Sequence, residues 1–377
     1  MRAAVCAVLL LAAPGFAQGV NPEQLFREGV AAQQRGDYAA AVIDYQRLLK
    51  QHPGMVDARG NLGAALVRLG RLDEAIVEYN SALQQEPGNS SVRLNLALAY
   101  YKKGDFAQAT GHLSTLHNSD PANVRAAVLL GDCYTRQNRA AEAVALLSPI
   151  ERSQPDDLDL AFVLGTALLR DGKTRAGLER IEKVAARGNS PDAYLTAGET
   201  YLQMSDFEQA RRNLDAALRL NPKLPGLHTL RGIVLDSLGD KPAAAAELEQ
   251  ALAANADDFK AHLHLGAIQF GERDMENAKR HLDRALQLNP ASTMARYEVA
   301  LTQRSSGEKE AAVKNLERVI HDDPNWLPPH VELAALYYQL RRQAEGARER
   351  EIVDRLTAEQ QARESQPRPV SLRTPSP

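Results

Sequence analysis

Residues 56–89 read VDARGNLGAALVRLGRLDEAIVEYNSALQQEPGN, and this stretch determines the fold. In its first half, Leu62, Leu66 and Leu69 recur at intervals of four and three residues, which places them on one face of an α-helix. Gly70 follows, and glycine adopts the left-handed conformation that ends a helix without steric strain. The first half therefore predicts one amphipathic helix that stops at a glycine.

The second half predicts another amphipathic helix, because Ile76, Tyr79 and Leu83 have the same kind of spacing. Pro87 follows this helix, and proline lacks an amide hydrogen and disfavours helical geometry in the residue before it. The whole stretch is thus a helix–turn–helix unit. One such pair cannot bury its apolar face alone, which predicts that further copies stack against it.

Small residues show that this unit recurs every 34 residues, with one interval of 33. In the first helix they are Gly29, Gly63, Ala97, Gly131, Gly165, Gly198, Gly232, Gly266, Ala300 and Ala334. Twelve residues further on, in the second helix, they are Ala41, Ala75, Ala109, Ala143, Gly177, Ala210, Ala244, Ala278, Ala312 and Gly346. Small side chains at both places let two helix backbones approach closely where the helices cross.

The pattern predicts ten repeats between residues 22 and 360. Their ranges are 22–55, 56–89, 90–123, 124–157, 158–190, 191–224, 225–258, 259–292, 293–326 and 327–360. The turn between the two helices is glycine or asparagine in seven of them, at Gly36, Gly70, Gly104, Asn138, Gly172, Gly239 and Gly307. The last helix is expected to run from Gln343 to Glu364, and its many charged residues suit the polar cap that a solenoid end requires.

Aromatic residues at fixed places complete a pattern that resembles the tetratricopeptide repeat (TPR) family. That family has large residues at positions 11, 17 and 24, which here include Tyr100, Tyr134, Tyr201 and Tyr337, then Tyr38, Phe106 and Phe207, then Tyr45 and Tyr79. The resemblance implies an all-α fold, a right-handed superhelical α-solenoid of about ten helix-turn-helix TPR units. It also implies that the first helix of each pair lines a concave groove in which family members bind their ligands.

The same resemblance carries groove positions 5, 9, 12 and 13 over to the third to sixth repeats. The candidate residues are Leu94, Leu98, Tyr101 and Lys102; Asp132, Thr135 and Arg136; Phe162, Thr166, Leu169 and Arg170; and Leu195, Glu199 and Leu202. This mixture suits an extended peptide or a partner helix, and its three basic residues suit acidic groups. The alternative is that the apolar members pack against neighbouring repeats and expose little surface.

The two ends of the chain fall outside the repeats. Residues 1–17 start with Met1 and Arg2, continue with an apolar run and end in small residues, which is typical of a secretory signal peptide. A buried helix is the alternative. We therefore expect an exported chain, periplasmic or extracellular, with no transmembrane segment after cleavage. The proline-rich residues 365–377 are expected to be a disordered tail, with a polyproline ligand as the alternative.

Charge and motifs argue against several functions. Lys and Arg total 45 and Asp and Glu total 48, so the formal net charge of −3 gives no basic face for nucleic acid. The sequence holds no phosphate-binding loop, nucleophile elbow or zinc-protease motif, and it suggests no cofactor and no metal. His262 and His264 are interpreted as surface or interface residues, and Cys133 as a core residue. Three acidic pairs are interpreted as helix caps, with calcium binding as the alternative: Asp156-Asp157, Asp257-Asp258 and Asp322-Asp323.

These observations favour a scaffold over an enzyme, because too few residues lie outside the repeats to build a catalytic domain. We expect a non-catalytic protein–protein interaction scaffold in the cell envelope, with a protein or peptide as partner. The alternative is an accessory subunit of an envelope enzyme or of a polysaccharide or protein secretion complex. RNA binding by helical repeats is disfavoured by the charge.

Overall fold

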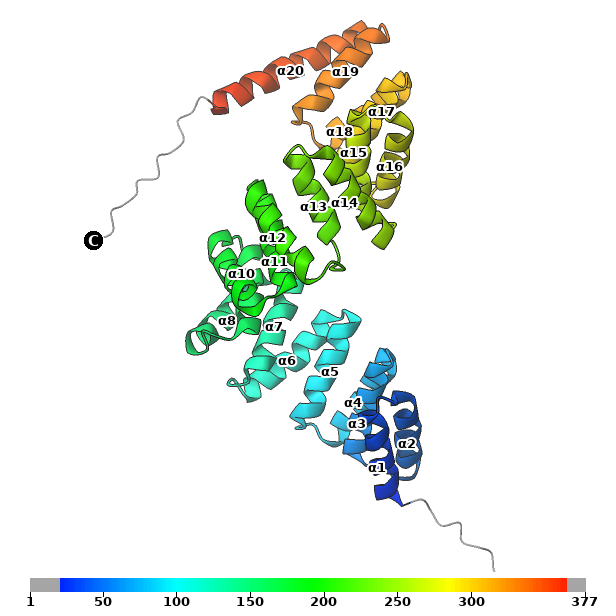
Figure 1. Ribbon diagram of the computed structural model, residues 1–377, viewed down its shortest axis with the longest axis vertical. Helices are drawn as coiled ribbons and strands as arrows, with labels where there is room; N and C mark the ends of the chain where they lie inside the picture. The colour runs from blue at the N-terminus through cyan, green and yellow to red at the C-terminus, as the bar shows by residue number, and fades with distance from the viewer. Residues whose placement is uncertain (1–20, 365–377) are drawn as a thin grey trace, which may run out of the picture. The chain divides into compact units, whose positions relative to one another are not determined.

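The structure, a computed structural model, describes residues 21–364. The signal peptide expected at residues 1–17 and the tail expected at 365–377 lie outside this range. Every regular element within the described range is an α-helix, and the helices are drawn in Figure 1. The chain divides after Lys183 into two compact units, and each unit is described by itself.

The described residues form twenty helices. Those of the first unit are α1 (Pro22–Gln34), α2 (Tyr38–Gln51), α3 (Val56–Arg68), α4 (Leu72–Gln85), α5 (Ser90–Lys103), α6 (Phe106–Ser119), α7 (Val124–Arg136), α8 (Ala140–Ser153) and α9 (Leu158–Arg170). Helix α10 (Thr174–Gly188) contains the division. Those of the second unit are α11 (Pro191–Gln203), α12 (Phe207–Leu220), α13 (Leu227–Ser237), α14 (Lys241–Ala254), α15 (Phe259–Gly271), α16 (Met275–Leu288), α17 (Thr293–Ser305), α18 (Lys309–Asp322), α19 (Leu327–Gln339) and α20 (Gln343–Glu364).

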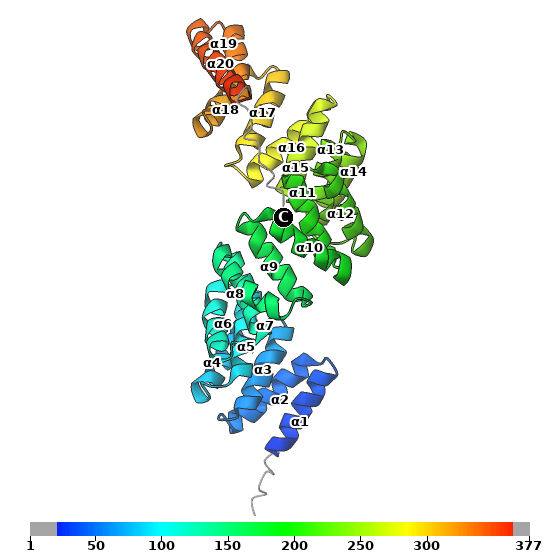
Figure 2. The ribbon, with the colours of Figure 1, turned by 90° about the vertical axis from the view of Figure 1, so that its left-hand side faces the viewer.

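Consecutive helices pack against one another in both units. Each helix from α1 to α9 contacts the next, and so does each helix from α11 to α20. First helices of neighbouring repeats also contact one another, as α7 does with α9 and α13 with α15. Figures 1 and 2 show the successive hairpins side by side within each unit. The predicted all-α solenoid of ten helix-turn-helix units is thereby confirmed for the described residues.

The small residues lie where the two helices of a pair cross, as expected. A side-chain carbon added at Gly63 would lie 2.6 Å from the ring of Tyr79. One added at Gly131 would lie 2.6 Å from Leu147. Tyr79 and Leu147 are fully buried, so neither can move aside into solvent. The large residue of the second helix therefore packs directly on the backbone of the first.

The turns within the pairs are more uniform than the sequence suggests. Gly70 and Asn138 have left-handed backbone angles, with φ of 75° and 59°, as the pattern predicts. Ser205, Arg273 and Arg341 stand at equivalent turns and are left-handed as well, with φ of 59°, 65° and 62°. This conformation costs a residue with a side chain about 1–2 kcal/mol. Packing of the two helices is therefore strong enough to impose the turn without glycine.

The acidic pairs have different roles. Asp157 and Asp258 each cap a first helix, because each side chain accepts a hydrogen bond of 3.0 Å from the backbone N–H three residues later. The same interpretation is wrong for Asp322 and Asp323. The residue that caps the following helix is Trp326, and its side chain makes no capping hydrogen bond.

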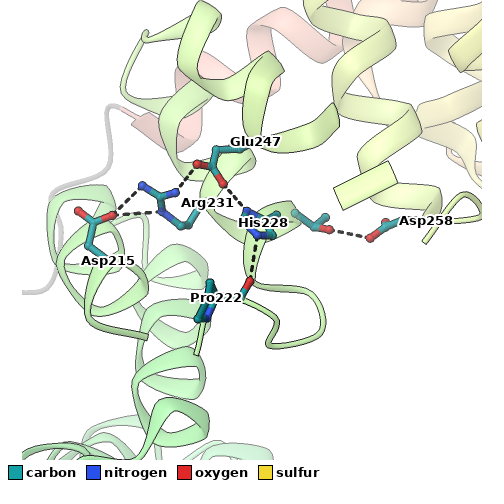
Figure 3. A network of polar contacts seen from close by, with 7 residues as sticks. Asp215, Pro222, His228, Arg231, Glu247 and Asp258 are labelled. Atoms are coloured by element: carbon teal, nitrogen blue, oxygen red, sulfur yellow. Dashed lines mark hydrogen bonds and ion pairs between the residues drawn. The ribbon is translucent and has the colours of Figure 1, made fainter. Parts of the chain in front are cut away.

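A polar network connects three helices of the second unit, as Figure 3 shows. Arg231 of α13 donates to Asp215 of α12 at 2.9 Å and also pairs with Glu247 of α14. His228 lies one turn before Arg231, with Nδ1 2.7 Å from the same Glu247 carboxylate and Nε2 3.1 Å from the carbonyl of Pro222. The side chains of Arg231 and Glu247 are only 17% and 13% exposed, so this network replaces apolar packing between the repeats.

The contact made by His228 recurs in other repeats. In the tenth repeat His330 lies 2.6 Å from Glu349. In the eighth repeat a histidine takes the place of the glutamate, and His262 Nδ1 lies 2.9 Å from His281 Nδ1. His262 therefore contacts the second helix of its own pair, in agreement with its interpretation as an interface residue.

His281 is expected to make the eighth repeat sensitive to acid. Burial, and then the neighbouring His262 and Arg280 side chains, lower the pKa of His281 from 6.5 to about 4. Between these two values the unfolded chain binds a proton that the folded chain does not bind. The free energy of unfolding should therefore fall as the pH falls through this window, by about 1–3 kcal/mol.

The substitution His281→Glu tests this expectation, because it supplies the carboxylate that His330 has in Glu349. His262 would then face a carboxylate, the buried imidazole of His281 would be gone, and the acid-induced loss at this repeat should disappear. Urea unfolding of both proteins near pH 7 and near pH 5 measures the difference. The idea is wrong if the variant loses as much stability between the two pH values as the parent chain does.

Candidate partner-binding surface

The candidate groove residues lie on the first helices of four repeats. Those on α5, α7 and α9 belong to the first unit, and those on α11 belong to the second. Helix α5 is linked to α7 through α6, and α7 contacts α9 directly. We call the candidate residues of α5, α7 and α9 the first-helix face: Leu94, Leu98, Tyr101, Lys102, Asp132, Thr135, Arg136, Phe162, Thr166, Leu169 and Arg170.

Three of these residues form a polar cluster across two repeats. The Tyr101 hydroxyl donates to the Asp132 carboxylate, and Arg136 Nε donates to the same carboxylate oxygen at 2.7 Å. The Arg136 guanidinium lies 5.4 Å from the ring centre of Tyr101 and 5.3 Å from that of Phe106. These contacts hold the cation over two aromatic rings, an arrangement that is favourable for a guanidinium. The cluster is thus an ordered polar anchor on the face.

The protonation state of Tyr101 is fixed by its surroundings. Burial, together with the hydrogen bond to Asp132, raises the pKa of Tyr101 to about 12. The hydroxyl therefore keeps its proton at neutral pH and remains a donor to the carboxylate. The Asp132 carboxylate accepts hydrogen bonds from both the Tyr101 hydroxyl and the Arg136 guanidinium. These hydrogen bonds orient the Arg136 side chain.

Three other candidates are turned toward their own repeat. Thr135 is 2% exposed, and its hydroxyl donates to the carbonyl four residues earlier at 2.8 Å. Thr166 makes the equivalent hydrogen bond at 2.9 Å. Leu169 occupies the space beside Gly177, where an added side-chain carbon would lie 2.8 Å from the Leu169 Cγ. The structure does not bring these three side chains to the polar cluster.

The apolar candidates are half-buried. Leu94 packs against the core of the first unit, and Leu195 and Leu202 pack against a core cluster of the second. Each still keeps part of its surface accessible. Leu98 and Phe162 are half-buried as well. Glu199 of α11 is exposed. Lys102 and Arg170 are exposed as well, so the first-helix face combines partly covered apolar groups with exposed charged ends.

One basic residue of this surface was missed by the sequence argument. Arg68 ends α3 at the place equivalent to Lys102, Arg136 and Arg170, and it is exposed. The intervals between the four are 34 residues, so the repeat period alone could have identified it. The candidate range began at the third repeat and left Arg68 out.

Metal ligands, membrane-spanning helices and a reactive thiol would each indicate a further function. Among residues 21–364, no group of three or more His, Cys, Asp or Glu side chains is arranged to hold a metal ion. The helices of that range include none long and apolar enough to cross a membrane. Cys133 is fully buried, and burial raises its pKa to about 12, so the thiol stays protonated as a core residue.

Two family models match the chain, and both describe the tetratricopeptide repeat. One matches residues 26–90, 195–245 and 229–292, and the other matches residues 68–120 and 102–162. A comparison with curated protein sequences found no match.

Solved structures of low sequence identity also resemble the chain. A tetratricopeptide repeat protein from Parabacteroides merdae is 17% identical, with a TM-score of 0.43, over 75% of this chain and 98% of that one. The Cut9-Hcn1 hetero-tetramer of APC/C gives 12% identity and a TM-score of 0.48 over 90% of this chain and 94% of that one. PilF of Pseudomonas aeruginosa gives 23% identity and a TM-score of 0.41 over 45% of this chain and 78% of that one.

The family assignment depends on the family models, because these TM-scores are low. Together the two models cover residues 26–162 and 195–292, which is more than half of the chain. The helix pairs, the small residues at their crossings and the left-handed turns agree with that match. The TPR fold in general supports the binding of proteins or peptides. The chain belongs to the tetratricopeptide repeat family.

Proposed function

We propose that this protein is a non-catalytic scaffold of the cell envelope that binds a partner protein on the first-helix face of its first unit. The observation that carries the proposal is the cluster of Tyr101, Asp132 and Arg136 beside the half-buried Leu98. An ordered polar anchor next to accessible apolar groups is the usual composition of a peptide-binding surface.

The proposed location depends on the signal peptide that the sequence predicts at residues 1–17, which precede the described range. Export would place the scaffold where envelope assemblies form. The proposal of a scaffold, in contrast, depends on the repeats themselves, which occupy nearly the whole described range. The two parts of the proposal can therefore be tested separately, by fractionation of cells and by partner binding.

Removal of the anchor is expected to weaken partner binding. The double variant Tyr101→Ala and Leu98→Ala removes the ring, the hydroxyl and one apolar group from the face, and it leaves the helix backbone intact. The partner, first identified by crosslinking in an envelope fraction, should bind the variant at least about tenfold more weakly, because interface anchors contribute about 1–2 kcal/mol or more. Titration with the purified partner measures the change.

A matched control lies on the second helices of the same unit. Ile43 of α2 and Val77 of α4 are 57% and 61% exposed, and Ile43→Ala with Val77→Ala removes apolar surface of similar size. This control should bind the partner as the parent chain does. Circular dichroism of both variants verifies that the helices remain folded.

A further inference from the structure

A basic stripe runs along the first unit at one end of its first helices. We define it as Arg68, Lys102, Arg136 and Arg170, which stand in the last turns of α3, α5, α7 and α9. All four residues are exposed. Their equal spacing in the repeats places one cation on each of four successive first helices.

The helix dipole does not account for the stripe. Cations in the last turn of a helix are favoured by the dipole, by about 0.3–1 kcal/mol each. That effect applies equally to the first helices of the second unit, which end in the same kind of turn. Those helices carry uncharged residues at the equivalent place: Gln203, Ser237, Gly271, Ser305 and Gln339. The stripe is therefore a property of the first unit and not of the fold.

The charges of the stripe are largely uncompensated within the described residues. Arg68, Lys102 and Arg170 form no ion pair or hydrogen bond there, whereas nearby cations do. Lys103 lies 2.5 Å from Asp73, and Arg180 lies 2.9 Å from Glu151. Arg136 pairs with Asp132, which leaves its guanidinium ordered over the rings of the anchor. Three free cations and one fixed guanidinium thus line the same edge.

The position of the stripe limits the shape of a ligand that would match it. The four cations stand on four successive first helices, so a ligand that meets all of them has to be elongated. Helix α7 contacts α9 directly, whereas α5 is linked to α7 through α6, so no single helix-to-helix distance sets the spacing of the cations. An extended segment with several carboxylates suits such a row of cations.

We infer that the basic stripe binds an extended acidic segment of the partner. This inference rests on the proposed function and specifies the chemistry of the bound segment. The half-buried Leu98 lies one helical turn before Lys102 and offers apolar surface close to the charges. The neutral equivalents in the second unit restrict the site to the first unit.

Synthetic peptides of about twelve residues test the inference with the full chain. One carries four glutamates, and a second has glutamine in place of each glutamate. Fluorescence anisotropy at low salt should show the glutamate peptide binding at least tenfold more tightly than the glutamine peptide. Equal affinity of the two peptides, or no binding of either, would overturn the inference.

A double variant that reverses two charges of the stripe tests where on the protein the peptide binds. Lys102→Glu with Arg170→Glu should weaken binding of the glutamate peptide at least tenfold. The control Lys50→Glu with Arg152→Glu makes the same change of charge in the last turns of the second helices α2 and α8, and it should weaken binding less than threefold. An equal loss in both variants would contradict a specific stripe.

The same variants separate this inference from the proposed function. If Tyr101→Ala with Leu98→Ala weakens partner binding and the Lys102 and Arg170 reversal does not, the stripe inference fails and the proposed function stands. If neither variant weakens partner binding, both fail. Circular dichroism of each variant shows whether a loss comes from unfolding.

Discussion

The substitution Gly177→Ala should destabilise the protein, by about 1–3 kcal/mol or more. A methyl group at Gly177 of α10 would lie 2.8 Å from the carbonyl oxygen of Gly165 and 2.8 Å from the backbone nitrogen of Leu169, both in α9. These neighbours are backbone atoms, so no side-chain rotation can relieve the contact. The two helices would have to separate, and the core between them would lose packing.

The same substitution at Gly111 should stabilise the protein instead of destabilising it. Gly111 lies inside α6, and an added methyl group there would meet no atom within 4 Å. Alanine is a better helix former than glycine, so Gly111→Ala should raise the free energy of unfolding by about 0.5–1 kcal/mol. Urea unfolding of both variants measures the pair. If Gly177→Ala were neutral or stabilising, helices α9 and α10 could not approach each other as closely at Gly177 as the structure shows.

The second large effect is expected at Arg231 in the network of Figure 3. Arg231→Ala would leave Asp215 and Glu247 without their cation, and Glu247 is only 13% exposed. Loss of one partner from a buried ion pair costs about 3–5 kcal/mol, and the partial exposure here points to the lower end of that range. Thermal or urea unfolding of the full chain would detect so large a change.

A leucine at the same place is the informative control. Six other repeats carry a buried leucine at the equivalent position: Leu62, Leu96, Leu130, Leu164, Leu265 and Leu333. Arg231→Leu restores apolar volume there, so it should cost clearly less than Arg231→Ala, although both remove the charge. If the two variants lose equal stability, packing at this place is less important than the network itself.

The fold could be predicted because the repeat period constrains backbone packing. A glycine such as Gly63 is required wherever a ring such as Tyr79 lies directly on the opposite helix. A small residue, glycine or alanine, stands at this place in every hairpin, which makes the pattern visible in one sequence. The charged last helix, expected over Gln343–Glu364, has the same bounds in the structure, because its polarity and its missing turn signals set it apart.

Other features depend on tertiary contacts that no local pattern records. Arg273 and Arg341 adopt left-handed turns because the two flanking helices are already held together by packing. Arg231 takes the place of a core leucine because Asp215 and Glu247 reach it from two other helices. These compensating carboxylates are 16 residues away on either side, where no repeat signature links them to the arginine.

The candidate site was predictable at the level of helix position only. The period correctly places Tyr101 and Asp132 on neighbouring first helices, but their hydrogen bond depends on side-chain direction. Leu169 turns toward its own repeat because Gly177, unlike the alanine at that place in eight other repeats, leaves room for it. Thr135 satisfies its hydroxyl on its own helix, as threonine commonly does when a carbonyl one turn back is available.

The proposed binding surface is the first-helix face of the first unit. The most direct measurement is the ratio of two dissociation constants for the purified partner. One belongs to Tyr101→Ala with Leu98→Ala, and the other to the second-helix control Ile43→Ala with Val77→Ala. We expect the first dissociation constant to be larger by about tenfold or more. A ratio near one, or a weaker complex with the control, would contradict it.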